Sequence, residues 1–182
     1  MSKTLILSFH PNLAASRASA ALIAAARALP DVEVVDIAGR YAAGEIDTAV
    51  EAARLLAARR LAWLFPVQWY APPATFKAWQ DAVLTRMYYV AYEAEGRRLE
   101  GTPLLVAATA GADAETYGPQ GANLYPLDEL FRPLQTTAHR CGLPWAEPFV
   151  VYRANKLSAE AAADAGRDFA QRLSKWRDAT TA

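Results

Sequence analysis

The stretch TLILSFHPNLAASRASAALIAAARALPDVEVVDI, residues 4–37, decides the fold because it holds a complete strand–helix–strand unit. Residues 4–9 form a short apolar run, which is typical of a strand buried on both faces. An alanine-rich helix is expected over 16–29, closed by a Pro-Asp pair, and a second strand over 32–37. Strands joined in this way are parallel, with a right-handed crossover.

The same alternation continues to the end of the chain. Further strands are expected over 61–65, 103–109 and 148–152, and helices over 47–60, 74–88, 127–141 and 158–176. In the helix over 47–60, Val50, Leu55 and Leu56 are expected to face inward, and Ser158 is expected to cap the last helix.

Five parallel strands separated by helices predict an α/β fold with helices on both faces of the sheet. The expected form is a flavodoxin-like, doubly wound sheet of order 2-1-3-4-5. There is no linker, repeat or change in composition, so residues 1–182 are expected to form a single domain.

Composition narrows the function. The 182 residues are 53% hydrophobic and 21% charged, and the formal net charge is +0. This balance gives no electrostatic case for binding nucleic acid or an acidic membrane surface. The apolar run at the N-terminus is too short for a secretory signal, and no stretch approaches the ~18 residues of a membrane span. A single cysteine, Cys141, fits a reducing compartment, so a cytoplasmic protein is expected.

Ligands of such a sheet bind beyond the carboxyl ends of the strands, where the strand order reverses. The first loop at that place, 8–19, contains no glycine, which argues against a dinucleotide fingerprint or a P-loop. It places His10, Ser16 and Arg17 at the start of a helix, where free amides favour an anion. The alternative is that Ser16 is only an N-cap.

The second loop, 66–73, is bounded by prolines. Pro66 ends a strand, and Pro72 and Pro73 stiffen the exit toward the next helix. Between them, Trp69 and Tyr70 offer a wall for a planar aromatic ligand. The alternative is that both rings pack under a neighbouring loop or at a subunit interface.

The third loop, 109–123, begins with small residues that allow a close approach to a ligand. Tyr117, Gln120 and Asn123 follow and are within reach of the same crevice. The alternative is an ordinary glycine-containing loop.

Other chemistries are not supported. A phospho-receiver domain needs acidic residues where His10 and Pro66 stand. Cys141 is expected to be a plain core residue rather than a nucleophile. Two histidines without clustered Cys, Asp or Glu predict no metal site.

Taken together, these loops resemble a known family, the flavodoxin-fold NAD(P)H:quinone oxidoreductases. The likeness is strongest to the ancillary oxidoreductases of glutathione-regulated potassium efflux systems, and it covers nearly the whole chain. It is carried by His10-Pro11, by PVQWYAPPATFKAWQD at 66–81 and by PLQTTAHRCGLPW at 133–145.

The resemblance implies noncovalent FMN, with FAD less expected because the chain ends soon after the fifth strand–helix unit. The first loop would hold the phosphate and ribityl chain, the second the isoalloxazine ring, and the third its pyrimidine end. The implied cofactor-binding residues are His10, Ser16, Arg17, Ala18, Ser19, Pro66, Val67, Gln68, Trp69, Tyr70, Thr109, Ala110, Gly111 and Ala112.

The resemblance also implies an enzyme in which NAD(P)H and then a quinone or related electrophile use the same flavin face in ping-pong order. Tyr117 and Asn123 stand at the positions that the long quinone reductases of this family use in hydride transfer, but those enzymes carry histidine where this chain has Asn123. The loop also holds less glycine than in many relatives. Asparagine can donate a hydrogen bond to a reduced flavin or quinone oxygen but cannot take up a proton near neutral pH.

Two partners are implied in the same way. A homodimer is expected because aromatic residues, among them Tyr88, Tyr89 and Tyr92, exceed what a small crevice needs. The alternative function is a regulatory subunit of a potassium efflux transporter, in which turnover is secondary. Such a protein would be peripheral to the inner membrane through its partner, without inserting directly.

Overall fold

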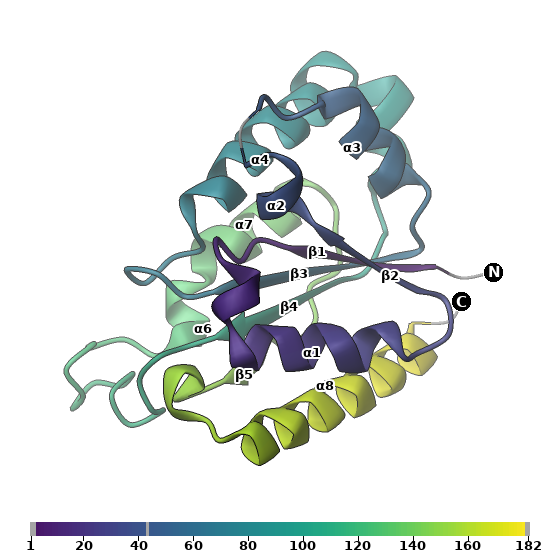
Figure 1. The fold of residues 1–182 in the computed structure, drawn as a ribbon. Coiled ribbons are helices and arrows are strands. Elements are labelled where there is room, and N and C mark those ends of the chain that lie inside the picture. Colours follow the sequence, from purple (N-terminus) through teal and green to yellow (C-terminus); the bar gives the residue numbers. More distant parts are fainter. Residues whose placement is uncertain (1–2, 43, 181–182) are drawn as a thin grey trace.

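A parallel sheet forms the centre of the computed structural model, which describes residues 3–42 and 44–180 (Figure 1). The strand order is β2-β1-β3-β4-β5, which confirms the predicted topology. The strands are β1 (Thr4–Ser8), β2 (Val32–Asp36), β3 (Arg60–Pro66), β4 (Leu104–Thr109) and β5 (Phe149–Val151).

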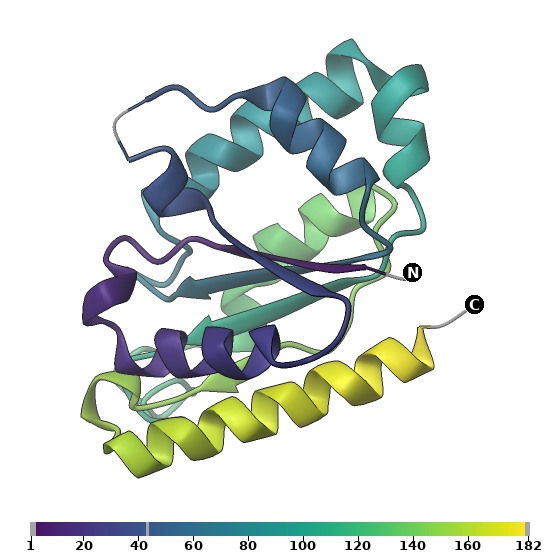
Figure 2. The ribbon, with the colours of Figure 1, turned by 45° about the vertical axis from the view of Figure 1, so that its right-hand side comes forward.

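Helices cover both faces of this sheet. The α-helices are α1 (Arg17–Arg27), α2 (Ile37–Arg40), α3 (Thr48–Leu56), α4 (Ala74–Thr85), α5 (Arg97–Leu99), α6 (Leu127–Leu130), α7 (Arg132–Arg140) and α8 (Ala159–Ala179). Short 3-10 turns are η1 (Leu13–Ala15) and η4 (Ala154–Lys156), and π-helical turns are η2 (Arg86–Val90) and η3 (Tyr92–Gly96). Figure 2 shows α1 and α8 side by side on one face, with α3, α4 and α7 on the other.

The two faces of the sheet bury separate apolar clusters. Leu5 and Leu7 of β1 join the cluster under α4 and α7, whereas Ile6 joins the one under α1 and α8. Covering on both faces explains why the predicted strands are continuous apolar runs rather than alternating ones. Trp63 and Phe76 pack edge to face in the larger cluster, with ring centroids 5.1 Å apart.

A glycine sets the spacing between the two helices on the smaller cluster. A Cβ on Gly166 of α8 would lie 2.8 Å from the carbonyl oxygen of Ala21 in α1. Glycine is unfavourable within a helix by roughly 1 kcal/mol relative to alanine. Its presence here is explained by the close approach of the two backbones.

Three predicted helices differ from the observed ones. The helix over 47–60 ends at Leu56, and Arg60 belongs to β3 instead. Within it Leu55 is buried, but the prediction for Val50 is wrong, since 41% of Val50 is exposed. The helix over 127–141 is broken into α6 and α7 because Pro133 lacks an amide hydrogen and clashes with the carbonyl four residues earlier.

The helix predicted over 74–88 keeps α geometry only to Thr85 and then widens into η2. The amide of Ala91 bonds the carbonyl of Arg86 at 2.8 Å, five residues back. The expectation that Tyr88 is a surface aromatic is wrong. Its ring is buried, and its hydroxyl donates to the carbonyl oxygen of Cys141 at 2.6 Å.

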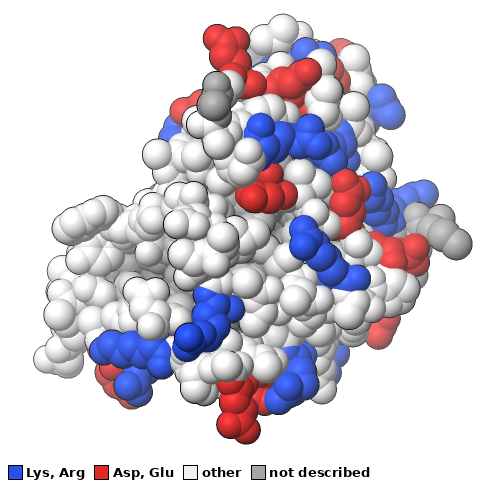
Figure 3. Space-filling model, in the orientation of Figure 1, with Lys and Arg blue, Asp and Glu red and all other residues white. Residues whose placement is uncertain are grey.

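Charged side chains are unevenly spread over the surface. Figure 3 shows Lys, Arg, Asp and Glu mingled over much of the molecule, while the left of the view, where the strands end, carries few of them. In the described ranges, no helix is both long and apolar enough to cross a membrane.

Candidate functional site

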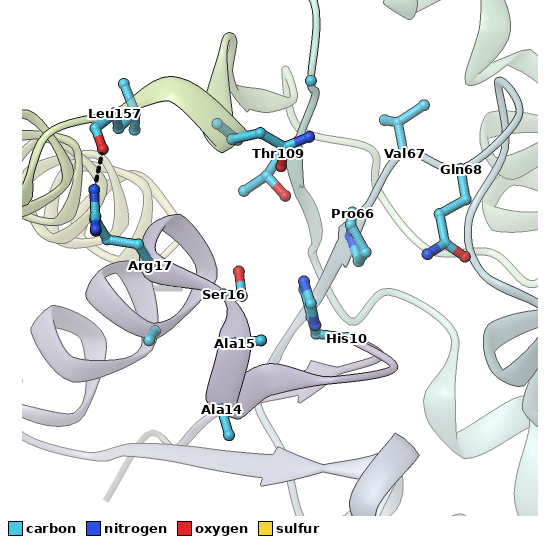
Figure 4. Close-up of a pocket in the computed structure, with 14 residues that line it drawn as sticks. His10, Ala14, Ala15, Ser16, Arg17, Pro66, Val67, Gln68, Thr109 and Leu157 are labelled. Carbon is cyan, nitrogen blue, oxygen red and sulfur yellow. Dashed lines mark hydrogen bonds between the residues drawn. The ribbon is translucent and has the colours of Figure 1, made fainter.

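The carboxyl ends of β1, β3 and β4 surround a cavity of about 830 Å³, which is within the size range of ligand sites. Figure 4 shows His10, Ser16, Pro66 and Thr109 around its open middle. Its lining residues are His10, Ala14, Ala15, Ser16, Arg17, Ala20, Pro66, Val67, Gln68, Thr109, Gly111, Ala154, Asn155 and Leu157.

One wall is the start of α1. The Ser16 hydroxyl oxygen accepts from the amide of Ser19 at 3.2 Å, so Ser16 is the N-cap. The amides of Arg17 and Ala18, the first two helical residues, have no acceptor within the helix. These amides, the hydroxyl hydrogen of Ser16 and the Arg17 guanidinium make this end of the cavity suited to an anion.

His10 supplies a neutral donor beside that wall. Its Nδ1 accepts from the amide of Asn12 at 3.1 Å, which places the proton of the neutral ring on Nε2. Burial lowers the pKa of His10 below its ordinary value, and the charge of Asp36 opposes this shift. At neutral pH the ring is therefore uncharged and presents Nε2–H.

The second wall is a tight turn at the end of β3. Gln68 donates to the carbonyl of Ala71 at 2.8 Å, and Ala71 donates back at 3.1 Å. The two residues between them, Trp69 and Tyr70, have φ values of 47° and 67°. Two left-handed residues in succession define a type I′ turn, which normally selects Asn-Gly.

Aromatic side chains make this turn strained, at roughly 1–3 kcal/mol for each left-handed residue. The turn is nevertheless fixed in place, since Val67 donates its amide to the carbonyl of Thr109 at 2.8 Å. Strain that the surrounding structure maintains is characteristic of functional sites.

The Trp69 ring lies outside the cavity, with 91% of the residue exposed. Tyr70 is 44% exposed, and its hydroxyl is 3.4 Å from Oδ1 of Asn123. The turn therefore offers backbone groups and Gln68 to the cavity, while its two rings face the surroundings.

Tyr117 and Asn123, the predicted catalytic residues, do not line the cavity, but both lie near Tyr70. Tyr117 packs against Tyr152 with ring centroids 6.1 Å apart. Burial, followed by the nearby Tyr70 and Tyr152, raises the pKa of Tyr117. Its hydroxyl therefore stays protonated at neutral pH and can donate a hydrogen bond.

The third wall is the end of β4, where Thr109 and Gly111 line the cavity. Ala110 is fully buried and Ala112 accepts from the amide of Arg153, so these two flank the cavity without lining it. Ala18 and Ser19 of α1 are likewise buried and do not line the cavity. The predicted residues thus divide between a lining set and neighbours that support it.

Sequence reasoning missed a fourth wall. Ala154, Asn155 and Leu157 follow β5, yet they line the same cavity. Arg17 ties this segment to α1, because its Nη1 donates to the carbonyl oxygen of Leu157 at 2.6 Å (Figure 4). The only available signal was the position of β5 beside β4, which brings its following loop to the same edge.

Other chemistry finds little support in the structure. Cys141 is buried, and that burial raises the pKa of its thiol to about 11, which leaves little thiolate at neutral pH. Among the described residues, no group of three or more His, Cys, Asp and Glu side chains is placed to hold a metal ion.

Comparison with known proteins agrees with this architecture. The model of the flavodoxin-like fold family matches residues 2–176. The glutathione-regulated potassium-efflux system ancillary protein KefF of Citrobacter koseri is 36% identical over 176 residues, covering 96% of this chain and 97% of the relative. The NAD(P)H oxidoreductase YdeQ of Bacillus subtilis is 33% identical, covering 94% and 86%.

A solved structure extends the comparison to a bound ligand. General stress protein 14 of Treponema denticola, determined in complex with FMN, is 32% identical, with a TM-score of 0.83 and coverage of 98% of this chain and 99% of that one. The resemblance found in the sequence motifs is thereby confirmed. The chain belongs to the flavodoxin-like fold family, alongside NAD(P)H oxidoreductases and ancillary proteins of potassium-efflux systems.

Proposed function

We propose that this chain is an FMN-dependent NAD(P)H oxidoreductase that reduces quinones or related electrophiles. Its relatives bear the names of NAD(P)H oxidoreductases, and a structural neighbour was solved with FMN. The observation that carries the proposal is the cavity itself, which joins an anion-binding helix start to a rigid turn at the switch point.

The donor set fits FMN at its phosphate end. The amide of Arg17, the Ser16 hydroxyl and the Arg17 side chain lie at one end of the cavity, and the amide of Ala18 follows them in the helix. A terminal phosphate needs such donors, and a neutral ligand of the same size would leave them without partners. His10 adds an uncharged donor that suits the ribityl hydroxyls.

The other end suits a flat ring with polar edges. Main-chain groups of the turn after Pro66 and of Thr109 border it, and Gly111 keeps the wall low where a Cβ would narrow the cavity. Hydrogen-bonding edges of the ring would meet backbone groups held by the type I′ turn and by β4.

Bound FMN would supply the hydride chemistry, taking a hydride from NAD(P)H and delivering it to the acceptor. The chain's part would be to position the acceptor and to hold its oxygen by a hydrogen bond, while the proton that completes the reduction would come from water. The Tyr117 hydroxyl, kept protonated by its raised pKa, would donate a hydrogen bond to the acceptor oxygen. The side-chain amide of Asn123, which accepts from the neighbouring Tyr70 hydroxyl, can donate or accept hydrogen bonds but cannot supply a proton.

Steady-state kinetics test this proposal. If NAD(P)H and the acceptor use the same face of the ring in turn, double-reciprocal plots of initial velocity are expected to be parallel when both substrates are varied. Intersecting plots would contradict the ping-pong order. A purified protein that is colourless after incubation with FMN, and fails to quench its fluorescence, would contradict the cofactor assignment.

A homodimer is part of the proposal. The loops that follow β3 and β4 expose the large apolar side chains of Trp69, Tyr70, Leu124 and Tyr125. The side of the molecule where the strands end also carries few charges (Figure 3). Exposed apolar patches of this kind mark protein interfaces. Sedimentation at micromolar concentration is expected to give twice the monomer mass, and a monomer would refute the pairing.

A second candidate function is regulation of a potassium-efflux transporter, favoured by the 36% identity to KefF over nearly the full length of both chains. In that role the protein would work in the cytoplasm, held to the membrane by its partner. Variants that lose quinone reduction discriminate the two. If they still protect cells from electrophile stress, the regulatory role gains, and if protection falls with turnover, catalysis is the function.

A further inference from the structure

The segment after β5 adds a polar side chain to the cavity that the family motifs do not identify. Of its three lining residues, Ala154, Asn155 and Leu157, only Asn155 has polar side-chain atoms. Asn155 is exposed rather than buried in the core. Within residues 3–42 and 44–180, the side-chain amide of Asn155 forms no hydrogen bond. The donor and acceptor of this amide are therefore available to a ligand.

Main-chain bonds on one side fix the position of Asn155. The amide of Arg153 donates to Ala112, and that of Ala154 donates to Ala110, both at 2.9 Å. These bonds carry the pairing between the fourth and fifth strands beyond their ends. The φ of Arg153 is 54°, a left-handed conformation, and Ala154 and Asn155, which follow it, line the cavity.

On the other side, the segment is fastened to α1. Arg17 donates to the carbonyl oxygen of Leu157, two residues after Asn155. Asn155 is therefore held between β4 and the start of α1. The main chain that carries this side chain is thus already ordered, so binding has to fix only the rotamer of Asn155.

Gly111 lies directly against the amide. A Cβ on Gly111 would be 3.1 Å from Nδ2 of Asn155, closer than nearly all such contacts. Its φ is not left-handed, so no turn requires glycine at this position. Glycine at position 111 therefore leaves room for the side-chain amide of Asn155.

We propose that Asn155 hydrogen-bonds the pyrimidine edge of the flavin ring, an inference that rests on the proposed function. That edge presents a carbonyl oxygen beside an N–H group. A side-chain amide offers the complementary pair, with Nδ2 as donor and Oδ1 as acceptor. The placement of Asn155 against Gly111, at the carboxyl end of β4, puts it at the end of the cavity bordered by this loop.

The phosphate is the other polar group of FMN, and it has its own donors. The amides of Arg17 and Ala18 and the Ser16 hydroxyl converge at the helix start. The Arg17 guanidinium stands between that site and Leu157 (Figure 4). Asn155 is thus assigned to the ring rather than to the phosphate.

Paired titrations with FMN and riboflavin, which share the ring but differ in the phosphate, test the inference. Asn155→Ala is expected to raise the Kd for both ligands by the same factor, about three- to tenfold for lost hydrogen bonds. Lys156→Ala is the matched control, since Lys156 shares η4 but does not line the cavity. It is expected to change neither Kd.

A second variant reads the redox state. Asn155→Asp keeps the shape but replaces the donor with a negative charge, which disfavours the anionic reduced flavin more than the oxidised form. The midpoint potential of the bound flavin is therefore expected to fall, while Lys156→Ala leaves it unchanged. An unchanged midpoint potential in Asn155→Asp, together with unchanged Kd values in Asn155→Ala, would overturn the assignment.

The outcomes separate this inference from the proposed function. A loss confined to FMN in Asn155→Ala would overturn the ring assignment in favour of a phosphate contact. Wild-type protein that binds flavin, with Asn155→Ala indistinguishable from it, contradicts the role of Asn155 alone. Wild-type protein that binds neither flavin contradicts the proposed function and this inference with it.

Discussion

Arg17, the first residue of α1, donates a hydrogen bond from Nη1 to the carbonyl oxygen of Leu157 at 2.6 Å. The bond joins residues 140 positions apart in the chain. It links the helix start that forms the anion end of the cavity to the segment that follows β5. The two walls are therefore coupled through one guanidinium.

The first prediction follows from that link. Arg17→Ala is expected to weaken FMN binding about tenfold, because a charge near the phosphate and the tie to Leu157 are lost together. Hydrogen exchange at residues 153–157 is expected to quicken in the same variant. Arg27→Ala, at the exposed far end of α1, is the control and is expected to leave both readouts unchanged. Equal behaviour of the two variants would refute the coupling.

The second prediction concerns His10 and pH. Because burial lowers its pKa in the folded protein, the unfolded chain binds a proton more readily. Its contribution to stability is therefore full above the unfolded pKa of about 6.5, and is lost progressively as pH falls from there to the lowered folded pKa. His10→Gln removes this titration.

Urea unfolding at a series of pH values between about 5 and 8 measures this effect. The difference in unfolding free energy between wild type and His10→Gln is expected to move against wild type as pH falls. A difference that stays constant over this range would show that His10 titrates alike in both states. The comparison isolates His10, since other groups titrate in both proteins.

The third prediction tests strain in the turn after β3. Trp69→Gly is expected to raise the unfolding free energy by about 1 kcal/mol, because glycine adopts positive φ without penalty and the exposed ring contributes little packing. Tyr125→Gly is the control, as Tyr125 is also exposed but has no positive φ. It is expected to be neutral or destabilising.

The unfolding free energies of both variants are to be measured at concentrations where sedimentation finds monomers, because Trp69 belongs to the proposed dimer surface. At higher concentration Trp69→Gly is expected to dimerise less. If it destabilises the monomer, the turn is not strained in the way its dihedral angles indicate.

The fourth prediction assigns the Tyr117 hydroxyl to turnover. Tyr117→Phe is expected to lower kcat for quinone reduction roughly tenfold to a hundredfold, with FMN affinity unchanged, because the ring stays and only the donor is lost. Tyr152→Phe, its ring neighbour, is the control. Full activity in Tyr117→Phe would remove this residue from the mechanism.

The sheet could be predicted from the sequence because its strands are buried on both faces and read as apolar runs. The order followed from the regular alternation with helices. The prediction of one helix over 127–141 missed the break at Pro133, because the helical pattern continues through it and only the missing amide hydrogen of the proline signals the break. The exposure of Val50 could not be predicted from the sequence, since the side of α3 that faces the core carries Glu51, Ala52 and Leu55 instead.

The cavity was only partly predictable. Loops after three strands were located by the switch point, and His10, Ser16 and Gln68 line the cavity as their positions suggested. Trp69 could not be placed, because its ring direction depends on a left-handed backbone that sequence patterns do not reveal. Asn155 carried no local signal at all, since tertiary contacts with Gly111 and Arg17 bring its segment to the site.

The most direct test of the central claim, that the start of α1 holds the phosphate of FMN, is the change in FMN Kd on replacing Ser16 by alanine. A hydrogen bond to a charged group is worth about 1.5–3 kcal/mol, so the Kd for FMN is expected to rise at least tenfold while that for riboflavin changes little. Ser158→Ala removes an equivalent N-cap from α8 at a residue that does not line the cavity, and is expected to leave FMN binding intact. Unchanged FMN affinity in Ser16→Ala, or an equal loss in Ser158→Ala, would contradict the account.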